Sequence, residues 1–187
     1  VLWKEETRDK DGNLVKSVRY AEDGKTVARV SEYKLLSGGV TDPQRNVLVS
    51  LIRYGKNNEE VFRYTANPDF SGFKTEKLFA DMNVRATKVF STQVVDGKYK
   101  HTLEKGIFLD AQTGNKIREI EFANGNSDDV RLVRTFDRKT GSKVIQEIEI
   151  LTPESYQVRD FGEGKSRRVT TFKGTPDDDN AEMISFE

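Results

Sequence analysis

The side chains of this chain that could carry chemistry are one histidine, the serines and threonines, and many carboxylates. His101 is the only histidine, so a catalytic triad would depend on this one residue and no histidine cluster can hold a metal. No serine lies in a Gly-x-Ser-x-Gly elbow, and no glycine-rich phosphate loop precedes a helix pattern. These patterns argue against hydrolase and nucleotide sites, and we expect His101 to lie at a strand edge or on the surface.

The acidic side chains, 31 in number, leave two other chemistries open. Any two carboxylates that meet in space could form a glycosidase-like pair. Two acidic turns, at residues 124–129 and 177–180, offer the oxygen ligands that calcium prefers, but neither has EF-hand spacing with its closing glutamate. We favour solvated turns, and predict a protein that is not an enzyme and holds no metal or cofactor. A carbohydrate-binding or glycosidase-type protein is the minor alternative.

Composition narrows the function classes further. The 187 residues include no cysteine, which removes thiol catalysis, cysteine-ligated metals and disulfides. Basic and acidic side chains balance at 31 each, so charge gives no reason to expect nucleic acid as a partner. The most apolar stretch, residues 47–52, is too short for a transmembrane segment. The start at Val1 fits either a mature protein after signal removal or a trimmed chain.

The elements that must position these residues follow a period of two, which is typical of half-buried strands. Turn signals rich in Asp-Gly and Asn-Gly separate the alternating runs and supply the positive φ of tight hairpins. They lie at residues 11–13, 23–25, 55–58, 96–98, 113–115, 124–126, 140–142 and 162–164. We predict an all-β, mainly antiparallel fold, a single domain over residues 1–187. About a dozen strands would form a meander, as a curved sheet, an open barrel or a sandwich.

Three segments depart from the alternating pattern. Residues 71–83 could form one short helix with Phe73, Leu78, Phe79 and Met82 on one face, although a loop and strand fit the same residues. Residues 37–46, with two glycines and a proline, predict a long connection. Residues 175–180 predict an acidic turn before a short last strand at 183–186.

An eight-residue unit occurs twice, at residues 110–117 and 137–144, and a weaker copy lies at 20–27. In each clear copy we expect the aspartate, Asp110 or Asp137, to cap the bend and the glycine, Gly114 or Gly141, to take the left-handed conformation. Each copy is followed by a strand that carries Glu-Ile-Glu. The repeat indicates a building unit of the meander rather than a solenoid.

These Asp-x-x-Thr-Gly-x-Lys turns and Glu-Ile-Glu strands, within residues 94–136, resemble hairpins of periplasmic lipid- and lipoprotein-carrier proteins. The resemblance implies a curved sheet around an apolar cavity with a lipid or acyl chain as ligand. Residues such as Ile107, Leu109, Ile120 and Phe122 would line it. The chain lacks the amphipathic N-terminal helix usual in that family. As a cysteine-free β protein with a non-Met start, it is also similar in type to accessory sheath proteins of spirochaete periplasmic flagella.

A hydrophobic-Arg-Tyr tripeptide recurs at three strand ends and supplies the candidate interface. If these strands are neighbours, the arginines form a row on one face, and Arg and Tyr are favoured at interfaces. Alternatively, the arginines are only the solvent face of a sheet whose aromatics line the core. The candidate residues are Arg19, Tyr20, Arg53, Tyr54, Arg63 and Tyr64. We predict a structural or interaction protein that docks other protein subunits in a periplasmic or otherwise extracytoplasmic assembly.

Overall fold

The computed structural model describes residues 3–36, 45–162, 167–178 and 181–186. The chain divides into two compact units, Val1–Phe79 and Ala80–Glu187. In the described part of the chain, all regular elements are strands apart from one short 3-10 helix. The strands pair antiparallel with their chain neighbours in each unit. This arrangement confirms the predicted all-β antiparallel meander.

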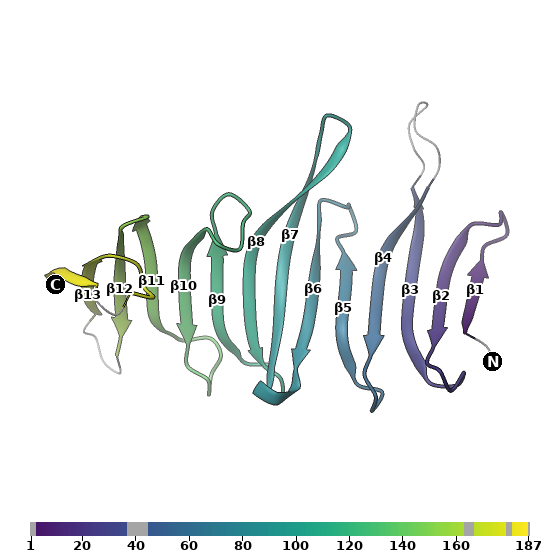
Figure 1. Cartoon of the computed structure of the whole chain (residues 1–187), viewed down its shortest axis with the longest axis horizontal. Helices are drawn as coiled ribbons and strands as arrows, with labels where there is room; N and C mark the ends of the chain where they lie inside the picture. The colour runs from purple at the N-terminus through teal and green to yellow at the C-terminus, as the bar shows by residue number, and fades with distance from the viewer. Residues whose placement is uncertain (1–2, 37–44, 163–166, 179–180, 187) are drawn as a thin grey trace. The chain divides into compact units, whose positions relative to one another are not determined.

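The first unit holds six strands side by side in chain order (Figure 1). Each strand is joined to the next by a hairpin, and the β3–β4 connection, predicted to be long, falls mainly outside the described residues. The strands are β1 (Lys4–Arg8), β2 (Leu14–Tyr20), β3 (Val27–Leu36), β4 (Arg45–Tyr54), β5 (Glu60–Ala66) and β6 (Gly72–Phe79).

The second unit begins with the 3-10 helix η1 (Ala80–Met82) and continues with eight strands in chain order. The β7–β8 hairpin has the longest strands, and its tip extends past the end of β9 (Figure 1). The strands are β7 (Val84–Val95), β8 (Lys98–Asp110), β9 (Lys116–Phe122), β10 (Val130–Phe136), β11 (Val144–Thr152), β12 (Ser155–Phe161), β13 (Arg167–Lys173) and β14 (Glu182–Phe186).

The helix considered for residues 71–83 is wrong, and the strand interpretation is right. Residues Gly72–Phe79 form β6, and only Ala80–Met82 take a helical turn. Cross-strand pairing decides the conformation, because Phe73 lies opposite Ala66 and its ring is 5.1 Å from that of Tyr64 on β5. Aromatic contacts across a sheet stabilise a strand where local helical periodicity is weak.

The predicted turns explain why the chain reverses where it does. The glycines of six predicted turns have positive φ between 66° and 86°, and the 55–58 turn has Asn58 at 62°. The eighth turn, at 162–164, lies partly outside the described residues. In the turn at 23–25, the Asp23 carboxylate accepts hydrogen bonds from the Thr26 hydroxyl and from the Lys25 and Thr26 amides. These bonds lower the pKa of Asp23 to about 2.

The two copies of the eight-residue repeat adopt the same turn and contact each other. Asp110 Oδ1 accepts the Thr113 amide at 2.8 Å, and Asp137 Oδ1 accepts the Thr140 amide at 3.1 Å. The Asn115 side-chain amide, in the first copy, donates to the backbone oxygen of Lys139 in the second at 2.9 Å. The repeat is therefore a pair of adjacent hairpin ends joined by a side-chain bridge.

Within the described residues, neither unit folds its sheet over itself, because substantial contacts are made only between strands that are consecutive in the chain. Few apolar side chains of the described residues are therefore buried, and the second unit holds five of these six. A β-branched row crosses four of its strands in register, which suits a pleated, half-buried surface. This row is Ile120, Val133, Ile148 and Val158. No helix in the described chain has the length and apolar character to cross a bilayer.

Candidate docking surface

Four basic side chains lie directly opposite one another on the first four strands of the first unit. Lys4 on β1 pairs with Arg19 on β2, Arg19 with Arg29 on β3, and Arg29 with Arg53 on β4. Residues that pair across antiparallel strands share one face of the sheet. We call Lys4, Arg19, Arg29 and Arg53 the cationic row.

The row has little internal charge compensation. Among the described residues, Arg19, Arg29 and Arg53 form no ion pair with a carboxylate, and only Lys4 does so, with Glu6. Arg29 Nε instead donates to the Ser31 hydroxyl at 3.0 Å. Like charges placed directly opposite each other destabilise a sheet, so these cross-strand pairs are unfavourable to the first unit.

An aromatic cluster continues the row on β5. Phe62 lies opposite Arg53, whose guanidinium carbon is 5.3 Å from the centre of the Phe62 ring. Tyr64, two residues further along β5, lies on the same face opposite the buried Leu51, and burial raises the pKa of its phenol. Beyond Phe62, Lys77 on β6 occupies the next position of the register. The face therefore combines cations with apolar ring surface.

The structure places the candidate residues on both faces of this sheet. Arg19, Arg53 and Tyr64 lie on the face of the cationic row. Arg63 does not: it pairs with Ile52, the neighbour of Arg53, and so lies on the opposite face. There it binds Glu60 at 2.7 Å, which raises the pKa of the guanidinium. The predicted row of three arginines is thus corrected at Arg63.

The tyrosines of the other two tripeptides lie at β-bulges. Tyr20 lies where the β2–β3 register shifts, and its hydroxyl donates to Glu5 at 2.9 Å. Tyr54 lies at the corresponding shift between β4 and β5, opposite Glu60. Sequence reasoning missed Lys4 and Arg29, which complete the row. The Asp23-Gly24 turn was the available signal, because it folds β3 back on β2 and brings Arg29 opposite Arg19.

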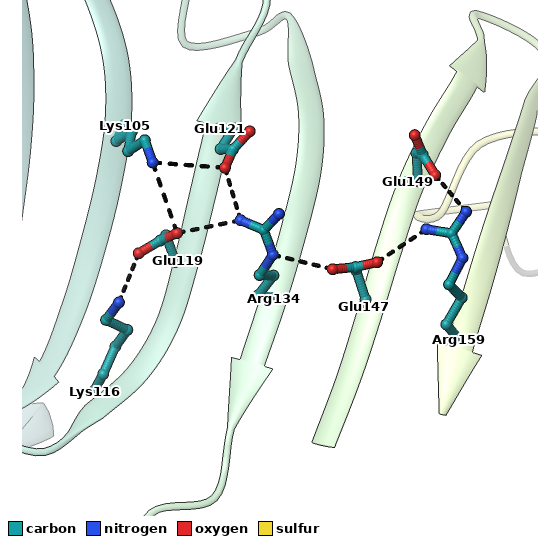
Figure 2. A network of polar contacts seen from close by, with 8 residues as sticks. All are labelled: Lys105, Lys116, Glu119, Glu121, Arg134, Glu147, Glu149 and Arg159. Atoms are coloured by element: carbon teal, nitrogen blue, oxygen red, sulfur yellow. Dashed lines mark hydrogen bonds and ion pairs between the residues drawn. The ribbon is translucent and has the colours of Figure 1, made fainter. Parts of the chain in front are cut away.

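The second unit arranges its charges differently, as Figure 2 shows for one face of β8–β12. Arg134 on β10 lies between Glu119 on β9 and Glu147 on β11, and Glu147 lies opposite Arg159 on β12. Arg134 binds Glu121 at 2.7 Å and Glu147 at 3.0 Å, and Arg159 binds Glu147 at 2.9 Å. Signs alternate from strand to strand, so each charge of this network is balanced within the unit.

The network changes the ionisation of its members. Hydrogen bonding by Arg134 lowers the pKa of Glu121 against the opposing effect of burial. Of the effects that act on Glu119, burial is the largest, and it raises the pKa of this carboxylate. The combined attraction of Lys116, Lys105 and Arg134 outweighs it, so the pKa of Glu119 is also lowered. Lys116 binds Glu119 at 2.7 Å and Lys105 lies 3.6 Å from Glu121. The carboxylates therefore stay ionised to lower pH than exposed glutamates.

The residues considered for other chemistries lie apart. His101 is on β8 opposite Thr92, whose hydroxyl is 2.9 Å from His101 Nδ1. In the described residues, no three His, Cys, Asp or Glu side chains converge to hold a metal.

The apolar residues considered for a lipid cavity are divided between the two faces. Ile107 lies opposite Glu119, on the network face, whereas Ile120 lies opposite Gly106, on the other. The expected lining of Ile107, Leu109, Ile120 and Phe122 therefore does not form one surface, because adjacent residues of a strand point to opposite sides.

Comparison of the sequence with protein-family models and with curated proteins gave no match. The surface that the geometry singles out is therefore interpreted from its own chemistry, which is that of four aligned cations beside an aromatic cluster.

Proposed function

We propose that this protein is a non-enzymatic docking protein that binds another protein subunit through the β1–β5 face of its first unit. The cationic row carries the proposal: four like charges lie opposite one another, three of them without a carboxylate partner in the described chain. Local rules of sheet stability are broken chiefly where function requires it. Arginine beside aromatic rings is also the composition typical of interface centres.

The setting of this docking rests on the type of sequence. A cysteine-free β protein rich in Lys, Asn and Glu is similar in type to accessory sheath proteins of spirochaete periplasmic flagella, so we propose that the assembly lies outside the bacterial cytoplasm, in the cell envelope. A periplasmic flagellar sheath is the example that the sequence type suggests. The lipid-carrier alternative has no structural observation in its favour.

Charge reversal on the two faces of the first unit tests the docking role. The variant Arg29→Glu/Arg53→Glu reverses two charges of the row. The control Lys16→Glu/Lys74→Glu makes the same change of net charge on the opposite face, because Lys16 and Lys74 pair with Thr7 and Thr65 there. Native mass spectrometry of each full-length protein from its source cells should show partner complexes lost only in the row variant. Complexes that survive in it, or no complex in the wild type, would contradict the role.

A further inference from the structure

The cationic row has a definite length and direction. It runs perpendicular to the strands, with one charge on each of β1–β4. Adjacent strands are about 4.8 Å apart, so three steps span about 14 Å. An extended polypeptide rises about 3.3 Å per residue, so a segment of about five residues covers the row.

The row ends on an apolar surface rather than on another charge. Phe62 follows Arg53 in the register, and its ring supports the guanidinium at 5.3 Å. A guanidinium held over a ring keeps its planar N–H groups available for a carboxylate. A ligand that follows the row would therefore meet four cations first and an aromatic side chain next.

We infer that the cationic row binds an extended acidic segment of the partner protein, lying across β1–β4, with an apolar side chain placed against Phe62. The segment would be acidic over about five residues, the span of the row, and two or three of its side chains would face the row, because successive side chains of an extended chain point to opposite sides. Arginine binds carboxylates through two parallel hydrogen bonds, which gives direction as well as charge neutralisation. This inference rests on the docking function and names the chemistry of the partner.

Charge number favours a protein over nucleic acid as the source of these anions. The whole chain is neutral, with 31 basic and 31 acidic side chains. Binding to duplex DNA commonly neutralises roughly six to ten phosphates, whereas the row supplies four cations. The adjoining Phe62 and Tyr64 add the ring surface that protein interfaces use.

Synthetic peptides test the inference directly. The probe is a fluorescent Glu-Glu-Glu-Glu-Phe peptide, with Gln-Gln-Gln-Gln-Phe and Glu-Glu-Glu-Glu-Gly as matched probes and duplex DNA as the competing polyanion. On the full chain at low salt, anisotropy should show binding of the Glu-Glu-Glu-Glu-Phe peptide and no binding of the glutamine peptide. The affinity of the first peptide should fall at least tenfold in Arg29→Glu/Arg53→Glu and stay within twofold in Lys16→Glu/Lys74→Glu. The glycine probe should bind several-fold more weakly than the phenylalanine probe.

Each other outcome overturns the inference in a recognisable way. Equal loss in both double variants would mean that net charge, not the row, holds the peptide. Tighter binding of duplex DNA than of the peptide would mean that the ligand of the cationic row is nucleic acid and not an acidic protein segment. Circular dichroism of the variants identifies any that fail to fold, and Arg29→Gln/Arg53→Gln then repeats the measurement without adding negative charge. If native partner complexes depend on the row but no peptide binds, the inference fails while the docking function stands.

Discussion

Arg29 and Arg53 lie directly opposite each other on adjacent antiparallel strands, although both side chains are positively charged. In the second unit the corresponding relationship is between opposite charges, since Arg134 lies opposite Glu147 and binds it at 3.0 Å. The same protein thus contains one ladder that repels itself and one that is neutralised from strand to strand. Of the two arrangements, only the second supplies favourable pairs of opposite charge across its strands.

The two units should respond to salt in opposite directions. Screening reduces repulsion in the cationic row and attraction in the Lys105–Arg159 network, and the Debye length falls to about 3 Å at 1 M salt. As sodium chloride rises, we expect hydrogen-exchange protection to increase in β3 and β4 relative to β9–β11. Labelling the intact chain and then measuring its proteolytic peptides by mass spectrometry resolves both regions in one experiment. A parallel change in both would show that the row does not repel measurably.

Removing Arg134 should destabilise the second unit. Arg134→Ala leaves Glu119, Glu121 and Glu147 clustered without their shared cation, and these carboxylates are only 11–20% exposed. We expect the free energy of unfolding to fall by about 1–3 kcal/mol, the range for leaving a buried polar group without its partner. Urea unfolding monitored in β9–β11 measures this loss of unfolding free energy. The control Arg118→Ala, at an exposed position on the other face, should stay within about 0.5 kcal/mol.

Acid should weaken the same network. The pKa values of Glu119 and Glu121 are lower in the folded chain than in the unfolded one. Their contribution is therefore complete above the ordinary glutamate pKa and is lost as pH falls through the lowered values. Urea unfolding between neutral pH and pH 3 should show stability falling below about pH 4.3. In Arg134→Ala the fall should be shallower, and an identical slope would contradict the assignment.

The paired turns of the repeat offer a matched test of glycine. Gly114 and Gly141 occupy equivalent positions with φ of 73° and 66°. A Cβ at Gly141 would lie 2.8 Å from the backbone nitrogen of Lys116, whereas one at Gly114 meets nothing within 4 Å. Alanine at Gly114 should cost about 1–2 kcal/mol from the left-handed backbone alone. Alanine at Gly141 should cost at least about 1 kcal/mol more, and equal costs in urea unfolding would show that the neighbouring turn moves aside.

The turns of this protein were predictable because Asp-Gly and Asn-Gly pairs determine local backbone conformation. The alternation of apolar and polar residues between these turns then predicted the strands, and short turns between consecutive strands predicted the all-β meander. The segment at 71–83 was ambiguous because its apolar residues fit two periods, and only its pairing with β5 decides for a strand. That no second layer covers the sheet of either unit within the described residues could not be predicted from the sequence, because it depends on contacts between strands that are distant in the chain.

The candidate surface was predictable only in part, for a reason of register. The tripeptides at Arg53 and Arg63 look equivalent in sequence, but the turn between them sets Arg53 opposite Phe62. Arg63 is therefore offset by one residue, which moves its side chain to the other face. Arg29 belongs to no tripeptide, so a search for repeated patterns passes over it. Only the pairing across the Asp23-Gly24 turn reveals it.

The pairing of strands with their chain neighbours has a kinetic consequence. In each unit, the strands that touch are joined by one hairpin, so the contacts that must form lie close together in the sequence. Sheet proteins usually fold slowly because distant segments must first find each other, and low contact order removes that search. Any hairpin of a unit can serve as a folding nucleus, and the neighbouring strands then add to it one after another. We therefore expect each unit to assemble faster than a β-sandwich of similar length.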